Sequence, residues 1–202
     1  DKNAMVAELA SGTGRRILFT RTKHQARKLA KKLTSDGIPA VDLHGNLSQP
    51  QRDRNLKAFG EGGVRVLVAT DVAARGVHVD AIELVVHVDP PAEHKAYLHR
   101  SGRTARAGSA GDVVTVVLPE QRRETQALLR RAGIQVAPQQ VTATSEAVEK
   151  VAGEVAPYRA PVERVVATSR PAAPAGAPRR SPGSSRRRSR RPSGAGGRTH
   201  QR

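Results

Sequence analysis

Short apolar runs alternate with amphipathic stretches along the first 141 residues of the chain. The runs are rich in Val, Ile, Leu and Ala and predict strands at residues 17–19, 39–43, 64–69, 82–88 and 113–118. The stretches between them repeat apolar positions with a helical period and predict helices or helical turns at residues 3–9, 22–35, 49–59, 72–75, 92–101 and 120–131. Because the strands are short, apolar and separated by helices, we expect an α/β fold with a parallel sheet sandwiched by helices.

Local signals mark where several of these helices begin and end. Thr22 and Ser48 stand directly before periodic stretches, where a hydroxyl can accept a hydrogen bond from an amide of the first turn. Gly37 and Gly133 follow periodic stretches and can end a helix in a left-handed conformation.

Polar clusters follow the predicted strands at regular places. Thr20-Arg21-Thr22, His44-Gly45 and Thr70-Asp71 come directly after three strands, and an arginine stretch at residues 99–108 comes one helix after the fourth. In open parallel sheets, ligands gather at the carboxyl ends of the strands. We therefore expect the clusters to form one site.

The arginine stretch places Arg100, Arg103 and Arg106 three residues apart, with Gly102 between the first two and Gly108 after the last. Forked guanidinium groups match phosphate oxygens, and so many cations close together repel one another unless an anion balances them. The stretch is a candidate polyphosphate or phosphodiester site, and the alternative is a solvated basic face.

Charge and composition divide the chain into three parts: a domain at residues 1–141, a linker at 142–156 and a tail at 157–202. The tail holds Arg, Pro, Ser, Gly and Ala with a single acid, and it carries +11 of the formal net charge of +17. With so few apolar residues we expect it to be disordered. Both the tail and the rest are basic, which favours a polyanionic partner such as nucleic acid.

The four aromatic residues, Phe19, Phe59, Tyr97 and Tyr158, are too few for a set of base-stacking platforms. We therefore expect contacts to the phosphate backbone that are blind to sequence and weakened by salt. The chain has no cysteine and no long apolar span, so we expect a soluble cytoplasmic protein without thiolate metal sites.

Four segments together resemble the DEAD-box RNA helicases. They match motifs IV, IVa, V and VI of that family in order and spacing, at residues 17–23, 49–52, 68–76 and 99–108. The resemblance covers about residues 1–141, which it identifies as the second RecA-like domain, and the most similar group is the bacterial RhlE-like one. It implies that ATP binds between two RecA-like domains and that RNA lies across both, with one strand of a duplex bent when they close.

The resemblance also implies roles at the nucleotide. Arg103 and Arg106 occupy the positions of arginine fingers, whose fixed charges stabilise the transferring phosphoryl group. His99 and Gly102 match positions that join the two domains at the nucleotide, although His99 alone would be a helix-surface imidazole. A further pair, Arg75 and Gly76, matches the segment that links nucleotide to RNA, where a bare glycine lets an amide approach a phosphate.

Thr22, Gly45, Arg52 and Thr70 match positions that hold the RNA backbone in the family. Hydroxyls, amides and one guanidinium suit phosphate and ribose, which carry no base sequence. The structural alternatives are helix caps for the two threonines and a helix-surface charge for Arg52. For Asp71, capping of the turn that follows it and a direct role are both open.

Two positions depart from the family pattern. His78 stands where the family has an Asp that reaches the ATP ribose, and a ring nitrogen could replace that hydrogen bond. Asp80 is two residues late, so the role is not transferred to it. Ala105 stands where the motif has Gly, and we expect this extra methyl to alter little.

The chain has neither a Gly-rich phosphate loop nor an Asp-Glu-Ala-Asp segment. We therefore expect a first RecA-like domain upstream of Asp1, which would hold most of the ATP and Mg²⁺ contacts, and no ATP hydrolysis by this chain alone. The leading hypothesis is the second half of an ATP-dependent RNA helicase that unwinds duplexes locally. The alternatives are a non-enzymatic RNA-binding or annealing protein that works through the tail, and a related DNA helicase.

Overall fold

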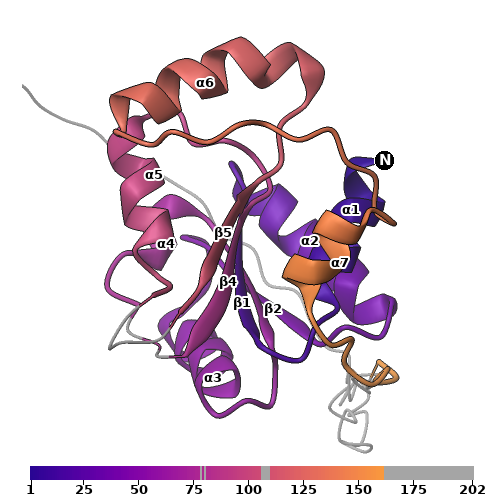
Figure 1. Cartoon of the computed structure of the whole chain (residues 1–202). Coiled ribbons are helices and arrows are strands. Elements are labelled where there is room, and N and C mark those ends of the chain that lie inside the picture. The colour runs from indigo at the N-terminus through magenta and orange to yellow at the C-terminus, as the bar shows by residue number, and fades with distance from the viewer. Residues whose placement is uncertain (78, 80, 106–109, 162–202) are drawn as a thin grey trace, which may run out of the picture. The chain divides into compact units, whose positions relative to one another are not determined.

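The computed structural model describes residues 1–77, 79, 81–105 and 110–161 of the chain (Figure 1). The predicted disordered tail lies outside these residues from position 162 onward. Five parallel strands form the expected sheet in the order β2-β3-β1-β4-β5. They are β1 (Arg15–Phe19), β2 (Ala40–Leu43), β3 (Val66–Ala69), β4 (Ile82–His87) and β5 (Asp112–Thr115).

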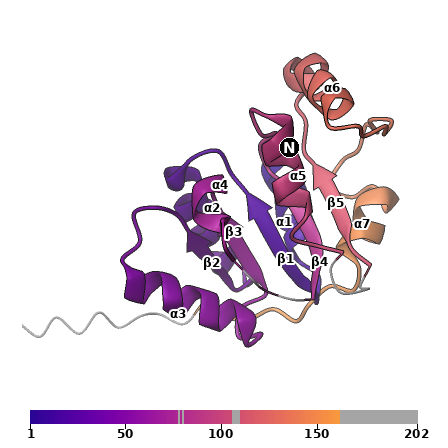
Figure 2. The same cartoon turned by 90° about the vertical axis from the view of Figure 1, so that its left-hand side faces the viewer.

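Helices cover both faces of this sheet, as the alternation of apolar runs predicts. The helices are α1 (Lys2–Ala10), α2 (Lys23–Ser35), α3 (Gln49–Gly60), α4 (Asp71–Ala74), α5 (His94–Ser101), α6 (Arg122–Arg131) and α7 (Glu146–Ala152), with a 3₁₀ turn at Pro119–Gln121 before α6. Residues of α1, α2 and α7 belong to one core cluster, and residues of α3 and α4 belong to the other. Figure 2 shows α3 near β2 and β3, and α6 on the β5 side of the sheet.

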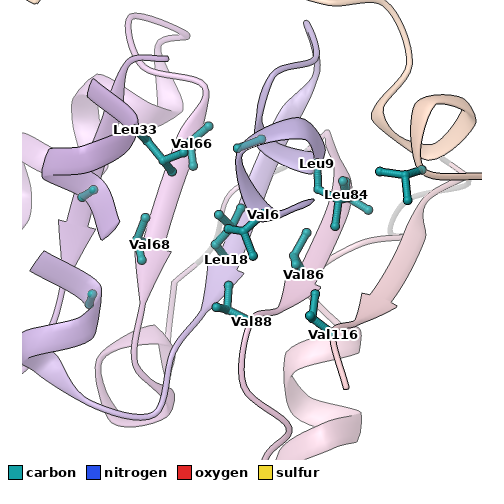
Figure 3. Packing of buried hydrophobic residues seen from close by; sticks show 14 residues of the cluster. Val6, Leu9, Leu18, Leu33, Val66, Val68, Leu84, Val86, Val88 and Val116 are labelled. Carbon is teal, nitrogen blue, oxygen red and sulfur yellow. The ribbon is translucent and has the colours of Figure 1, made fainter. Parts of the chain in front are cut away.

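The two faces of the central strands divide the core between them. Leu18 of β1 points to the α1 and α2 side, while its neighbours Ile17 and Phe19 point to the α3 and α4 side. Val6 and Leu9 of α1 lie over this face in Figure 3, close to Leu18 and Leu84. These side chains are at most 2% exposed, so each contributes nearly its full hydrophobic stabilisation to the fold.

The predicted cap of α2 is confirmed as a reciprocal pair. The Thr22 hydroxyl accepts from the amide of Gln25 at 3.2 Å, and the Gln25 side-chain oxygen accepts from the Thr22 amide at 3.0 Å. Gly37 follows the helix with φ +82°, which is the left-handed conformation expected of a glycine stop.

The segment expected to be a linker, residues 142–156, contains a helix. Val148 and Ala152 of α7 are buried, and Val148 belongs to the core cluster that includes Val6 and Leu9 of α1. Their spacing of four residues is a helical signal in a stretch otherwise poor in apolar residues. The part of the domain that packs on the sheet therefore extends past residue 141.

A strap of residues 153–159 continues from α7 along the domain. The amide of Thr13 donates to Glu154 O at 2.8 Å, and the amide of Ala156 donates to Ser11 O at 2.8 Å. At the end of α2, the Arg159 amide donates to Gly37 O at 3.0 Å. The first residues of the expected tail are thus hydrogen-bonded to the domain.

The buried guanidinium of Arg16 joins the two terminal helices from inside. It donates to Leu9 O near the end of α1 at 2.5 Å and to Ala152 O of α7 at 2.6 Å. Burial is the main cause that lowers the pKa of Arg16. Because helix C-termini leave carbonyls without partners, one arginine here satisfies two helix ends.

No helix in the described ranges is both long and apolar enough to cross a lipid bilayer.

Candidate nucleic-acid interface

The last residues of the five strands form one continuous row across the sheet. Leu43 lies beside Ala69, Ala69 beside Phe19, Phe19 beside His87, and His87 beside Thr115. The polar clusters that follow these strands therefore meet at one edge, as expected.

Backbone hydrogen bonds continue past the row and hold the first polar residues in place. The amide of Thr20 donates to Ala69 O at 3.0 Å, and the amide of Thr70 donates to Leu43 O at 3.1 Å. Lys23 of α2 also reaches across the edge, donating from Nζ to Asn46 Oδ1 at 3.1 Å. The segments after β1, β2 and β3 thus form one connected surface.

The structure brings three of the four residues that the resemblance assigns to RNA, Thr22, Gly45 and Thr70, to this edge. Thr22 and Gly45 are exposed, and a Cβ added at Gly45 would meet no atom within 4 Å. Thr70 is half-buried, and its hydroxyl makes no capping hydrogen bond to α4. The structure therefore does not support the alternative that Thr70 serves as a side-chain helix cap. Arg52 is half-buried in the first turn of α3, which follows the end of β2 after five intervening residues.

One arginine of the 99–108 stretch is engaged inside the protein. Arg100 is 3% exposed and donates from Nε and Nη2 to the two carboxylate oxygens of Asp71 at 2.5 and 2.7 Å. Its Nη1 also donates to Asp89 O at 2.8 Å. Within the candidate stretch, Arg100 is therefore bound to protein groups and ties α5 to the start of α4.

Asp71 is the first residue of α4, and its carboxylate binds Arg100 instead of capping the helix. The two residues are 29 positions apart, so local sequence patterns carry no signal for this pair. The only hint is that Arg100 has no acid within four residues along the chain, so a counter-charge for it has to come from elsewhere in the fold.

Below this pair lies a buried layer of rings. Arg100 stands 5.1 Å over the centre of the Phe19 ring, and the ring of His87 meets that of Tyr97 edge to face at 4.6 Å. Burial, and secondarily the charge of Arg100, lowers the pKa of His87 to about 3. His87 is therefore neutral, and its Nδ1 lies 3.2 Å from the Thr115 hydroxyl.

Arg103 connects the end of α5 with the segment that follows α4. Its Nη1 donates to Val77 O at 2.9 Å, and its Nε donates to His99 O at 3.3 Å. The side chain is half-buried, whereas Arg75 and His99 are exposed. The guanidinium is thus held at the edge by two backbone carbonyls.

The two glycines assigned to the nucleotide region have different geometry. Gly76 has φ +73° and open space around its Cα, so the backbone there requires glycine and stays accessible. Gly102 follows α5 directly, and its amide donates to Leu98 O at 2.9 Å, which closes the helix end.

Ala105 adopts φ +55°, in the left-handed region that a residue with a Cβ avoids. The expectation that Ala in place of Gly alters little stays a prediction, and this backbone conformation argues for a local cost of the extra methyl. The preceding residue, Thr104, is buried and donates its hydroxyl to Ile82 O. Arg106 and His78 lie outside the described residues.

The edge offers cations and open backbone amides, which are the groups that suit phosphate oxygens. Within the described ranges, no three His, Cys, Asp or Glu side chains are grouped to hold a metal ion. The edge therefore fits a polyphosphate or a phosphodiester chain through positive charge and hydrogen-bond donors.

A family comparison agrees with this combination of a parallel sheet and a basic edge. The chain belongs to the family of the helicase conserved C-terminal domain, whose profile matches residues 1–108. Within that family its similarity is to DEAD-box RNA helicases. It is 41% identical over 123 residues to the ATP-dependent RNA helicase drs1 of Aspergillus oryzae, and 50% identical over 101 residues to the ATP-dependent rRNA helicase RRP3 of Mycosarcoma maydis.

Those alignments cover 61% and 50% of the chain but only 15% and 18% of the two relatives, so the chain spans less than a fifth of their length. Among solved structures, it is 32% identical to the E. coli DEAD-box protein SrmB bound to regulator of ribonuclease activity A, with a TM-score of 0.65, covering 80% of this chain and 91% of that one. It is also 32% identical to S. cerevisiae Dbp5 bound to RNA and ADP BeF3, with a TM-score of 0.65, covering 76% and 42%. The resemblance to DEAD-box helicases is confirmed, and the RhlE-like subgroup stays a prediction.

Proposed function

We propose that this chain is the second RecA-like half of an ATP-dependent RNA helicase, in which ATP binding and hydrolysis are coupled to RNA binding and local duplex unwinding. The observation that carries the proposal is the row of strand ends. It gathers Thr22, Gly45 and Thr70 at the same edge as the segments that hold Arg103. Dbp5, a structure similar to this chain, is bound to RNA and to ADP BeF3.

At the nucleotide, ATP supplies the phosphoryl group that is transferred to water. Hydrogen bonds to Val77 O and His99 O hold the guanidinium group of Arg103 in place, so the group does not have to be oriented during the reaction. With Arg106 it would act as an arginine finger. His99, Gly102, Arg75, Gly76 and His78 would complete the nucleotide side of the interface between domains.

The Mg²⁺ ion and most phosphate contacts would come from an upstream RecA-like domain of the longer protein. That assignment rests on the resemblance, since the phosphate loop and the Asp-Glu-Ala-Asp segment are absent from residues 1–202. Closure of the two domains on ATP and RNA would bring the arginines to the nucleotide.

On the RNA side, Thr22, Gly45, Arg52 and Thr70 would bind phosphate and ribose groups. Contacts of this kind are independent of base sequence and weaken as salt rises. The Arg-rich segment from residue 157 would add affinity of the same type.

The test is steady-state ATP turnover by the longer protein, measured without nucleic acid, with single-stranded RNA and with DNA of the same sequence. We expect stimulation by RNA, and we expect Arg103→Ala to lower turnover by about 10³-fold or more, because a finger acts on the transition state. RNA affinity should stay within about threefold, since the finger is not an RNA contact. The exposed Arg122→Ala on α6 is the control and should retain turnover.

Other results point to other functions. Equal stimulation by DNA would indicate a related DNA helicase. RNA binding without any turnover would indicate a non-enzymatic RNA-binding or annealing protein. Parallel loss of folding and RNA binding in Arg103→Ala would remove the finger assignment.

A further inference from the structure

Helix α2 carries positive charge without any acid along its length. Its thirteen residues, Lys23–Ser35, include five Lys or Arg and no Asp or Glu. His24, Arg27, Lys28 and Lys31 are all exposed and follow the spacing i, i+3, i+4, i+7, which places them on one stripe of the helix. This stripe is called the α2 basic face below.

The α2 basic face is the side of the helix opposite the core. The helix packs on the sheet through Ala26, Ala30 and Leu33, which are at most 5% exposed. Figure 1 shows the helix on the same side of the sheet as α1 and α7. The charged stripe therefore points to solvent.

The charges of this face are not balanced within the described part of the chain. Lys32, next to the stripe, pairs with Asp36 at 2.7 Å, but Arg27, Lys28 and Lys31 form no ion pair with any described residue. Arg27 and Lys31 are four residues apart, as are Lys23 and Arg27, so like charges face one another and oppose helix formation. By contrast, α3 mixes signs, with Lys57 3.8 Å from Glu61.

Helix α2 starts at the strand-end edge and ends at the strap that leads to the Arg-rich segment. At its start, Thr22 and the Lys23 to Asn46 hydrogen bond belong to the edge described above. At its end, Gly37 holds the strap: Arg159 N–H donates to Gly37 O, and a Cβ at Gly37 would meet the Tyr158 ring at 1.9 Å. Three residues beyond Arg159 begins the sequence segment 162–202, which contains eleven arginines and one acid.

We propose that the α2 basic face is an additional contact surface for the RNA backbone, which extends the RNA path from the strand-end edge toward the root of the Arg-rich segment. The proposal rests on the proposed function, because it takes RNA as the ligand of the edge. Thirteen helical residues span about 20 Å, which is the length of about six nucleotides at about 3.4 Å per nucleotide of one strand. The face suits any sequence, since it offers point charges and no base-reading geometry.

The experiment uses the full chain of 202 residues and two single-stranded RNAs of mixed sequence. One has about six nucleotides, enough for the edge, and the other has about 24, enough for the edge and the helix. Binding is measured by fluorescence anisotropy at about 50 and about 200 mM salt, where phosphate contacts weaken strongly. The variant is Arg27→Gln, Lys28→Gln and Lys31→Gln combined.

The control removes the same charge elsewhere. Arg122→Gln, Arg123→Gln and Arg131→Gln are exposed on α6, which packs on neither of the two core clusters. Both triple variants keep the Arg-rich segment, so its contribution to affinity is the same in each. Thermal melts check folding, and the α2 variant should melt no earlier than the wild type because like charges have been removed.

We expect the α2 variant to bind the long RNA about tenfold more weakly at low salt, with the logarithmic salt slope reduced by about 2, or about 0.7 for each lost phosphate contact. Its affinity for the short RNA and the affinity of the α6 variant for both RNAs should change less than about twofold. Equal losses in the two variants, or an unchanged salt slope, would overturn the proposal and leave the face to an acidic protein partner. Failure of the wild type to bind either RNA would instead remove the proposed function itself.

Discussion

At the scale of single residues, the pair of Arg100 and Asp71 links two elements of the candidate site. It joins α5 to α4 and is supported by the Phe19 ring beneath it. Replacing Asp71 by Asn would leave the buried guanidinium without its counter-charge. We expect Asp71→Asn to lower the free energy of unfolding by about 2–3 kcal/mol, less than for a fully buried pair because the Asp71 side chain is 39% exposed.

Urea unfolding followed by circular dichroism measures this loss. The control is Glu61→Gln, which breaks the exposed pair with Lys57 and should cost less than about 0.5 kcal/mol. Equal effects of the two substitutions would mean that the existing hydrogen bond to Asp89 O is enough to hold Arg100 without Asp71.

The backbone of Ala105 leads to a prediction of the opposite sign. At φ +55°, glycine is favoured over alanine by about 1 kcal/mol, so Ala105→Gly should raise the free energy of unfolding by roughly that amount. The matched substitution is Gly76→Ala at φ +73°, which should destabilise by about 1 kcal/mol or more. Both are measured by thermal or urea unfolding, and a destabilising Ala105→Gly would contradict the assigned conformation.

What the sequence predicts at this scale depends on distance along the chain. The Thr22 cap is predictable because Gln25 is three residues away. The Arg100 to Asp71 pair is not, because its partners meet only when β3 and α5 are in place. The strain at Ala105 is visible only as a departure from the family motif, since φ is set by the folded loop.

At the scale of elements, α7 is the part that the sequence pattern understates. It buries Val148 and Ala152 and packs the partly buried Val151 against the same core, which are too few positions for a clear period. We expect Val148→Ala to lower the free energy of unfolding by about 2 kcal/mol, since two buried methyl groups leave a cavity against the α1 core.

The matched control is Val136→Ala in the segment between α6 and α7, where the side chain is 64% exposed and the change should stay within about 0.5 kcal/mol. Urea denaturation measures both. No difference between them would support the original expectation of a linker at residues 142–156.

The strands are predicted far better than α7 for a physical reason. In β3 every residue is buried, so the apolar requirement applies to consecutive positions and is plain in the sequence. In β5, at the edge of the sheet, Asp112 and Val113 are exposed, and the ladder is shorter than the apolar run at 113–118. The strand-end edge is predictable because it follows from the order of strands and helices. The hydrogen bonds of Arg16 to α1 and α7 are not, because they depend on tertiary packing that no local sequence pattern specifies.

At the scale of the whole molecule, the buried His87 makes folding sensitive to acid. The pKa of His87 is about 3 in the folded protein against the ordinary 6.5. Between these two pH values the imidazole is protonated in the unfolded chain but neutral in the folded protein. Stability from this group is fully present above about pH 6.5 and is lost as pH falls toward 3, by up to about 1.4 kcal/mol per pH unit.

The measurement is urea unfolding at several pH values between about 7 and 5 for the wild type and for His87→Phe. The phenyl ring keeps the edge contacts with Phe19 and Tyr97, so the variant should fold and show a flatter dependence on pH. Identical slopes would mean that His87 is protonated in the folded state or that other groups dominate the acid response.

The strap has a mechanical consequence for the whole molecule. If RNA held by the Arg-rich segment is pulled, tension enters the domain at residue 161 and reaches the Arg159 to Gly37 hydrogen bond first. Next come the bonds of Ala156 with Ser11 and of Thr13 with Glu154, both outside the sheet. We therefore expect the hydrogen bonds of the strap to break one after another under load, while the parallel sheet that carries the strand-end edge stays intact.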